Sequence, residues 1–241
     1  MLRANLAGMK AHRESHRVGR TGWLRAAVLG ANDGLISTSS LVIGMSVAGT
    51  GPRAVLMAGL AGLVAGSLSM AAGEYVSVSS QSDSESADLA REKRELVVAP
   101  EAEHRELAGI YVQRGLSPAL ADQVASEMMA HDALGAHARD ELGIFEITRA
   151  RPVQAALTSA SSFASGALPP LLVAAFVSAA ALPFTIAALT LALLLFLGAL
   201  AARLGGAAPL RAALRVAFWG GVAMAGTALV GHLFGAVGVS T

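Results

Sequence analysis

The hydrophobic and polar positions of this 241-residue chain alternate in long blocks rather than in short periods. Five blocks are mostly apolar, and they cover about residues 23–48, 54–78, 153–180, 183–202 and 210–237. A helix needs about 20 mostly apolar residues to cross a bilayer. The pattern therefore predicts an all-α membrane protein with five transmembrane helices and one polar domain, which lies between the second and third of them.

The polar domain itself has helical periodicity and clear boundary residues. Its first predicted helix continues from the second apolar block and ends before Pro100. The second runs to Gly115, and the third begins after Ser117, a capping residue that Pro118 follows, and continues to about Gly143. Proline favours the first position of a helix, and glycine favours the position after its end. The polar domain is therefore predicted to be a three-helix unit.

The basic residues predict how the chain crosses the membrane. Lys and Arg gather in the N-terminal tail and in the link at 203–215, whereas the link near residue 182 carries no charge. Cytoplasmic segments are usually the ones rich in Lys and Arg. We therefore expect a cytoplasmic N-terminus and polar domain and an outside C-terminus. The predicted units are a basic tail (1–22), transmembrane helices one and two (23–79), the cytoplasmic domain (80–151) and transmembrane helices three to five (152–241).

Composition agrees with this class and excludes several others. Hydrophobic residues make up 54% and charged residues 15% of the chain, whereas about 25% of residues are charged in typical water-exposed domains. The net charge of +1 gives no sign of a nucleic-acid partner, and the absence of cysteine excludes disulfides and thiolate metal sites. Abundant Ala, Gly and Arg are typical of a GC-rich bacterial genome, which predicts the bacterial plasma membrane.

Two carboxylates, Asp33 and Glu74, fall within the apolar blocks. A charge at bilayer depth costs about 3 kcal/mol or more and usually serves a function. Asp33 is therefore interpreted as a cation or proton site, or as a hydrogen-bond acceptor for a neighbouring helix. Met70 precedes Glu74 by one turn and shares its face. Sulfur with a carboxylate favours a transition metal, although Met70 alone could simply fill a core gap.

The polar domain is strongly acidic, with 14 of the 17 acids of the chain against seven Lys and Arg. Four acids form one helical stripe at i, i+3, i+7 and i+10, namely Glu85, Asp88, Glu92 and Glu95. Like charges at this spacing repel each other unless cations neutralise them. Glu103 and Glu106 repeat the pair on the next helix, and the third helix offers Met128, Met129 and Asp132.

These residues predict a metal site with many carboxylates. Its predicted ligands are Glu92, Glu95, Glu103, Glu106, Met128, Met129 and Asp132. Carboxylates with methionine and without cysteine favour Fe²⁺ or Mn²⁺. A solvated acidic face is the preferred explanation of Glu85, Asp88 and Glu101. Glu101 and His104 form one E-x-x-H motif, but a ferritin-like di-iron site needs two such motifs and four helices.

Several motifs resemble the vacuolar iron transporter family from about Gly22 to the C-terminus. They are "DGLISTSSLVIG", "SMAAGEYVSVSSQ", "YVQRGLSPALADQVA" and "HDALGAHARDELGI". The resemblance implies five membrane spans, a cytoplasmic three-helix metal-binding domain, and a homodimer with its path between the subunits. It also implies exchange of Fe²⁺, and often Mn²⁺, for protons, without enzymatic activity or a prosthetic group.

The resemblance assigns Asp33, Met70 and Glu74 to the translocation path and the seven predicted ligands to the cytoplasmic site, with His131 or Glu127 as alternatives to Asp132. A bacterial chain would move metal out of the cytoplasm. An alternative function is a membrane-anchored metal sensor or store, which would have no reason to keep Asp33 and Glu74. An organic-cation transporter would need an aromatic-lined cavity, and aromatic residues make up only 5% of the chain.

Overall fold

In the computed structural model, the described residues are 21–145 and 150–236, and they form helices and connecting turns. The helices are α1 (Thr21–Val47), α2 (Pro52–Val98), α3 (Pro100–Gln113), α4 (Pro118–Asp140), α5 (Pro152–Phe176), α6 (Leu182–Gly205) and α7 (Pro209–Ala236). The prediction of an all-helical chain is therefore confirmed. Five of these helices begin with proline, as expected for a residue whose fixed φ suits the first turn.

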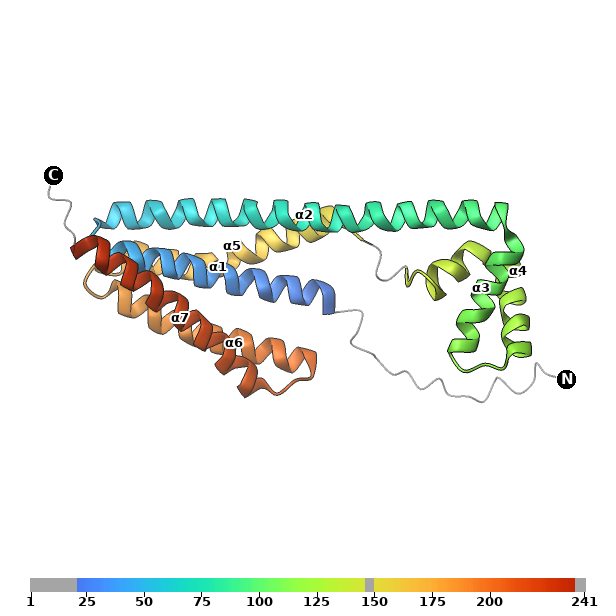
Figure 1. The fold of residues 1–241 in the computed structure, drawn as a ribbon. Helices are drawn as coiled ribbons and strands as arrows, with labels where there is room; N and C mark the ends of the chain where they lie inside the picture. Colours follow the sequence, from blue (N-terminus) through green and yellow to red (C-terminus); the bar gives the residue numbers. More distant parts are fainter. Residues whose placement is uncertain (1–20, 146–149, 237–241) are drawn as a thin grey trace, which may run out of the picture.

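The long helix α2 connects two parts of the molecule (Figure 1). At one end it lies against the bundle of α1, α5, α6 and α7, and at the other end α3 and α4 fold back beside it. The helix has 47 residues, which at 1.5 Å per residue gives a length of about 70 Å. The second apolar block and the start of the polar domain thus form one continuous helix, as the sequence indicates.

Four helices in the described part of the chain are long and apolar enough to cross a membrane, namely α2, α5, α6 and α7. Helix α1 has 27 residues, but Asn32, Asp33 and the hydroxyl run at 37–40 make it less apolar. Several of these polar side chains are buried against neighbouring helices. Ser39, for example, is fully buried and shares a hydrogen bond of 2.7 Å with Thr190 of α6.

Glycines let the bundle helices approach one another closely. A side chain at Gly34 of α1 would fall against the main-chain oxygen of Phe163 of α5, and one at Gly231 of α7 would fall against the main chain of Gly44. Gly235, one turn after Gly231, faces the main chain of Ala48. Small residues allow such contacts between helices in lipid. The Gly231–Gly235 pair therefore packs within the chain, where it joins α7 to α1.

Helices α3 and α4 enclose a small apolar core of Leu107, Tyr111, Ala121, Ala125 and Ala136. The predicted third helix of the polar domain is not continuous, because Asp132 has non-helical angles (φ −159°, ψ 91°). Its Oδ1 accepts a hydrogen bond of 3.0 Å from the Gly135 main-chain N–H, so it caps the segment that follows. The break turns the last two turns of α4 back toward α2.

Candidate metal centre

Three side chains from α2 and the end of α4 converge on one point. They are Glu92, His137 and Glu141, and one ligand atom of each lies within 4.8 Å of the other two. Glu92 is 3% exposed and His137 is fully buried, while Glu141 is partly exposed. Two carboxylates and an imidazole at this spacing can hold a divalent transition metal. This triad is the centre of the candidate site.

The contacts at His137 bring two acceptors to one nitrogen. Its Nδ1 lies 2.8 Å from Oε2 of Glu141 and 3.0 Å from Oε1 of Glu92. An imidazole nitrogen carries at most one hydrogen, and the contact to Glu92 leaves its Oε1 buried without a hydrogen bond. A buried carboxylate oxygen without a donor is costly. A cation among these three groups would satisfy both carboxylates at once.

Glu103 of α3 adds a second buried carboxylate, with 7% of its surface exposed. Burial raises the pKa of Glu92 and of Glu103, and the charges of neighbouring carboxylates raise them further, while His137 acts in the opposite direction. Glu95 and Glu141 are among the carboxylates that act on both groups, and Glu106 acts on Glu103. The structure thus gathers four of the seven predicted ligands, all of them glutamates, in one electrostatic cluster.

Within this cluster, Glu95 and Glu106 are exposed whereas Glu92 and Glu103 are buried. The exposed pair therefore lies on the solvent side of the buried carboxylates. The cluster therefore combines carboxylates that are hydrated with carboxylates that are largely removed from water.

The other three predicted ligands lie in different surroundings. Met128 and Met129 are partly buried against the apolar core of α3 and α4. Met128 and Asp132 also line a pocket on the α2 side of the break, and the Asp132 carboxylate caps Gly135. In the described residues, the side chains that lie next to the Glu92 carboxylate as possible ligands are those of His137 and Glu141. Their i, i+4 spacing near the end of the third predicted helix is the sequence signal that could have indicated them.

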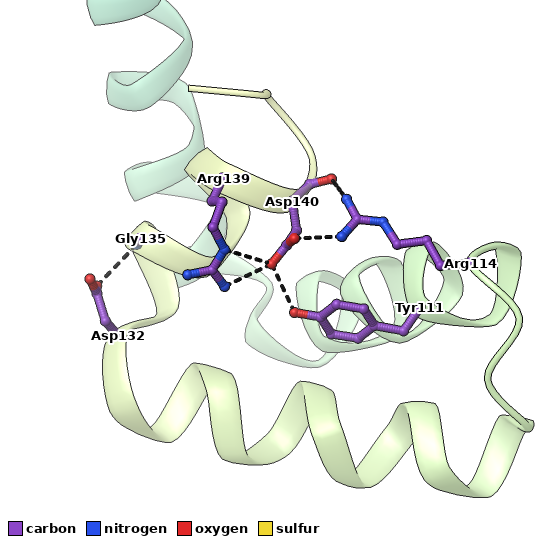
Figure 2. A network of polar contacts seen from close by, with 6 residues as sticks. All are labelled: Tyr111, Arg114, Asp132, Gly135, Arg139 and Asp140. Carbon is purple, nitrogen blue, oxygen red and sulfur yellow. Dashed lines mark hydrogen bonds and ion pairs between the residues drawn. The ribbon is translucent and has the colours of Figure 1, made fainter. Parts of the chain in front are cut away.

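A second polar network fixes the end of α4 next to Glu141 (Figure 2). The Asp140 carboxylate accepts hydrogen bonds from Tyr111 at 3.0 Å, from Arg114 at 2.6 Å, and from Arg139 at 2.8 and 3.2 Å. Burial alone would raise the pKa of Asp140, but these hydrogen bonds outweigh it and hold that pKa below its usual value. Asp140 is therefore a structural anion whose acceptor positions are occupied.

The three predicted path residues lie on the bundle helices α1 and α2. Asp33 is exposed on the surface of the single chain, while Met70 and Glu74 are half-buried. Gly34, next to Asp33, and Gly66, one turn before Met70, both face Phe163 of α5. Asp33 therefore lies within a few turns of Met70 and Glu74 along the bundle.

Known proteins resemble nearly the whole chain. The VIT family profile matches residues 24–232. A vacuolar iron transporter of Acanthamoeba castellanii is 44% identical over 94% of this chain and 85% of its own length. Vacuolar iron transporter homolog 1 of Oryza sativa subsp. japonica is 41% identical over 92% of this chain and 78% of its own length. Vacuolar iron transporter homolog 2 of Arabidopsis thaliana is 37% identical over 91% of this chain and 88% of its own length.

These relatives are named as transporters and not as enzymes, which agrees with the expectation from the sequence motifs. The family match and the relatives each cover far more than half of the chain. The chain therefore belongs to the VIT family.

Proposed function

We propose that this protein is a proton-coupled antiporter that moves Fe²⁺, and also Mn²⁺, out of the cytoplasm. The observation that carries the proposal is the convergence of Glu92, His137 and Glu141 beside the buried Glu103. The relatives named as iron transporters support iron as the transported ion. The metal is the transported substrate, and the cluster is its cytoplasmic binding site.

The chemistry of the cluster suits the exchange of a divalent metal for protons. The raised pKa values of Glu92 and Glu103 bring proton binding closer to neutral pH. Metal and protons then compete for the same oxygens, because a carboxylate must lose its proton to bind a metal. Glu95 and Glu106 would receive the ion at the solvent side, and Glu92, Glu103, His137 and Glu141 would hold it.

The membrane part supports a topology of five spans. Helix α1 would be the fifth span, alongside the four apolar helices, because its 27 residues reach about 40 Å and exceed the hydrocarbon thickness. An odd number of spans places the two termini on opposite sides. We assign the basic N-terminus and the α3–α4 domain to the cytoplasm and the C-terminus to the outside of the plasma membrane.

The position of Asp33 supports a homodimer. Leu29, Asp33 and Leu41 are exposed on one stripe of α1, and Asp33 would otherwise face lipid. An intramembrane carboxylate is usually directed to the interior of a bundle or to a water-filled cavity. A second copy related by twofold symmetry would cover this stripe with the same surface. The path would then run between the subunits along Asp33, Met70 and Glu74.

The exchange needs an energy source. Moving one positive charge outward against an inside-negative potential costs about 2.3 kcal/mol per 100 mV, and a divalent ion doubles this cost. Proton entry down its gradient can supply that free energy. The same protons can release the metal when they bind to the carboxylates of the path.

The test is metal flux through purified protein in liposomes, with the potential clamped. Fe²⁺ under reducing conditions, or Mn²⁺, is expected to accumulate in the lumen only when a pH gradient is imposed, and the lumen should become less acidic as protons leave in exchange for metal. Equal accumulation with and without the gradient would rule out antiport. Saturable metal binding without any flux would favour the membrane-anchored sensor or store.

A further inference from the structure

The candidate metal centre contains one nitrogen ligand among several carboxylates. We propose that His137 makes this centre selective for divalent transition metals over Mg²⁺ and Ca²⁺. The inference rests on the proposed function, because it takes the cluster to be a metal site. It goes further by naming the side chain that sets which cations bind.

Selectivity is needed because carboxylates alone do not provide it. Glu92, Glu103 and Glu141 offer only oxygen, which is also the ligand that Mg²⁺ and Ca²⁺ prefer. An imidazole nitrogen changes this preference, since its affinity rises from Mn²⁺ through Fe²⁺ and Co²⁺ to Ni²⁺. One nitrogen within an oxygen cluster therefore adds affinity for transition metals and little for Mg²⁺.

The burial and the contacts of His137 hold its ring between the carboxylates of Glu92 and Glu141. Its side chain has no exposed surface, so the ring cannot exchange its contacts for water without local opening of the structure. Nδ1 lies 3.0 Å or less from both carboxylates, and Nε2 is buried without a hydrogen-bond partner. No hydrogen bond at Nε2 therefore accounts for the ring orientation, and the carboxylates at Nδ1 do.

The other histidines of the α3–α4 domain lie in different surroundings. His104 shares a hydrogen bond of 2.8 Å with Ser126 and lies 3.7 Å from Asp122, while His131 is exposed. In the part of the chain that the structure describes, His137 alone belongs to a group of three possible ligands. His104 is therefore the matched control for loss of an imidazole from this domain.

The experiment compares the affinities of full-length protein in lipid nanodiscs for Mg²⁺, Mn²⁺ and Co²⁺, measured by calorimetry. The variants are His137→Glu, which makes the centre all-oxygen, His137→Gln, and the control His104→Gln. Loss of an outer-shell partner of a metal ligand usually costs about 10–100-fold in affinity, and loss of a ligand itself should cost at least as much. We therefore expect His137→Glu to lose about tenfold or more for Co²⁺, less for Mn²⁺, and to retain or gain affinity for Mg²⁺.

His104→Gln is expected to keep the wild-type ratio of Co²⁺ to Mg²⁺ affinity. The visible absorption of bound Co²⁺ adds a readout of the ligand set, since it should change in both His137 variants and remain unchanged in His104→Gln. If His137→Glu disturbs folding, as judged by circular dichroism, His137→Gln provides the comparison.

Two failures can be distinguished. If replacing Glu92 and Glu103 with Gln leaves the binding of divalent ions at the wild-type level, the metal site itself is contradicted, and with it the proposed function. Wild-type binding that depends on those carboxylates, together with an unchanged Co²⁺ to Mg²⁺ ratio in both His137 variants, would overturn only the selectivity assigned to His137.

Discussion

Arg114 holds Asp140 at two points, through the carboxylate and through the main chain. Its Nη1 donates to Oδ1 at 2.6 Å and its Nη2 donates to the main-chain carbonyl at 2.7 Å. Asp140 precedes Glu141 in the chain, so these two hydrogen bonds also fix the main chain that carries the candidate ligand Glu141. The short segment after the Asp132 break needs such support, because isolated helices shorter than about 12 residues are marginal in water.

Replacing Asp140 with Asn is expected to loosen this segment. The amide keeps the shape of the carboxylate, but it loses the charge that Arg114 and Arg139 neutralise. Hydrogen bonds to charged groups contribute about 1.5–3 kcal/mol each, and half of the Arg114 side chain is exposed, so we expect a loss of about 2 kcal/mol. Hydrogen exchange at α3 and α4 should become faster, and metal affinity should fall.

Asp122→Asn is the control for Asp140→Asn, because the Asp122 side chain is 67% exposed and its contact with His104 is 3.7 Å long. It should leave exchange and affinity close to wild type. Unchanged protection of the α4 segment in Asp140→Asn would show that the contacts of Asp140 do not hold Glu141 in place.

The stability of the metal-free protein around Glu92 and Glu103 is expected to rise as the pH falls from neutral toward the usual carboxyl pKa of 4.5. Burial raises the pKa of Glu92 and Glu103 above the usual 4.5, so their ionised forms disfavour the folded state. Protonation removes that penalty as the pH passes through the raised values. Thermal unfolding without metal, monitored across this range, checks the direction.

Bound Mn²⁺ should reverse this trend, because protons displace the metal from the same carboxylates. The stabilisation by Mn²⁺ is therefore expected to be greatest near neutral pH and to decrease as the pH falls through the raised pKa values of Glu92 and Glu103. Asp140 does not contribute to the change in stability over this pH range. Its pKa lies below the usual 3.8, so its contribution is present throughout this range and is lost only under more acidic conditions. Metal-free protein that loses stability as the pH falls from neutral toward 4.5 would contradict the assignment.

The sequence allowed the helices to be predicted closely, because proline marks their starts. Pro100 and Pro118 begin α3 and α4, and the second apolar block continues without a breaking residue into the acidic stripe. The break at Asp132 could not be predicted, because neither proline nor glycine occupies that position. The Asp132 cap on Gly135 is a local contact, but the segment after the break is also held by Arg114, whose contact with Asp140 is a tertiary one.

The same break explains why the sequence did not indicate His137 and Glu141 as candidate ligands. On an unbroken helix, Met128, Met129 and Asp132 would be as good candidates as the residues that follow them. The change of direction at Asp132 instead brings His137 and Glu141 to Glu92. The i, i+3 spacing of the four glutamates on regular helices is independent of that break, and their role as ligands stays a prediction.

Asp33→Asn is expected to stop transport and to leave metal binding by the cluster of Glu92, His137 and Glu141 unchanged. The amide keeps the size and hydrogen bonding of the side chain but removes the charge and the titratable proton. Flux in liposomes should fall by orders of magnitude, whereas calorimetric Mn²⁺ affinity should stay at the wild-type value. Near-normal flux through a folded Asp33→Asn protein would remove Asp33 from the path.

Gly34→Ala tests the packing of α1 against α5. The added methyl group would fall against the main chain of Phe163 and 3.1 Å from the Ala167 nitrogen, and main-chain atoms cannot turn aside as a side chain does. Overpacking of this kind costs about 1–3 kcal/mol. Thermal inactivation in detergent should occur at lower temperature than for Gly226→Ala, where nothing lies within 4 Å. Equal thermal stability of the two variants would contradict this close contact.

The continuity of α2 also sets a relation of helical phase between its two groups of carboxylates. Glu92 follows Glu74 by 18 residues, which is about five turns, so the two side chains leave the helix on the same side and about 27 Å apart. Two extra residues between them would turn Glu92 by about 200°, to the opposite side, whereas about seven would restore the phase to within about 20°. The two side chains therefore keep a common side of α2 only when the length between them changes by close to a whole number of helical turns.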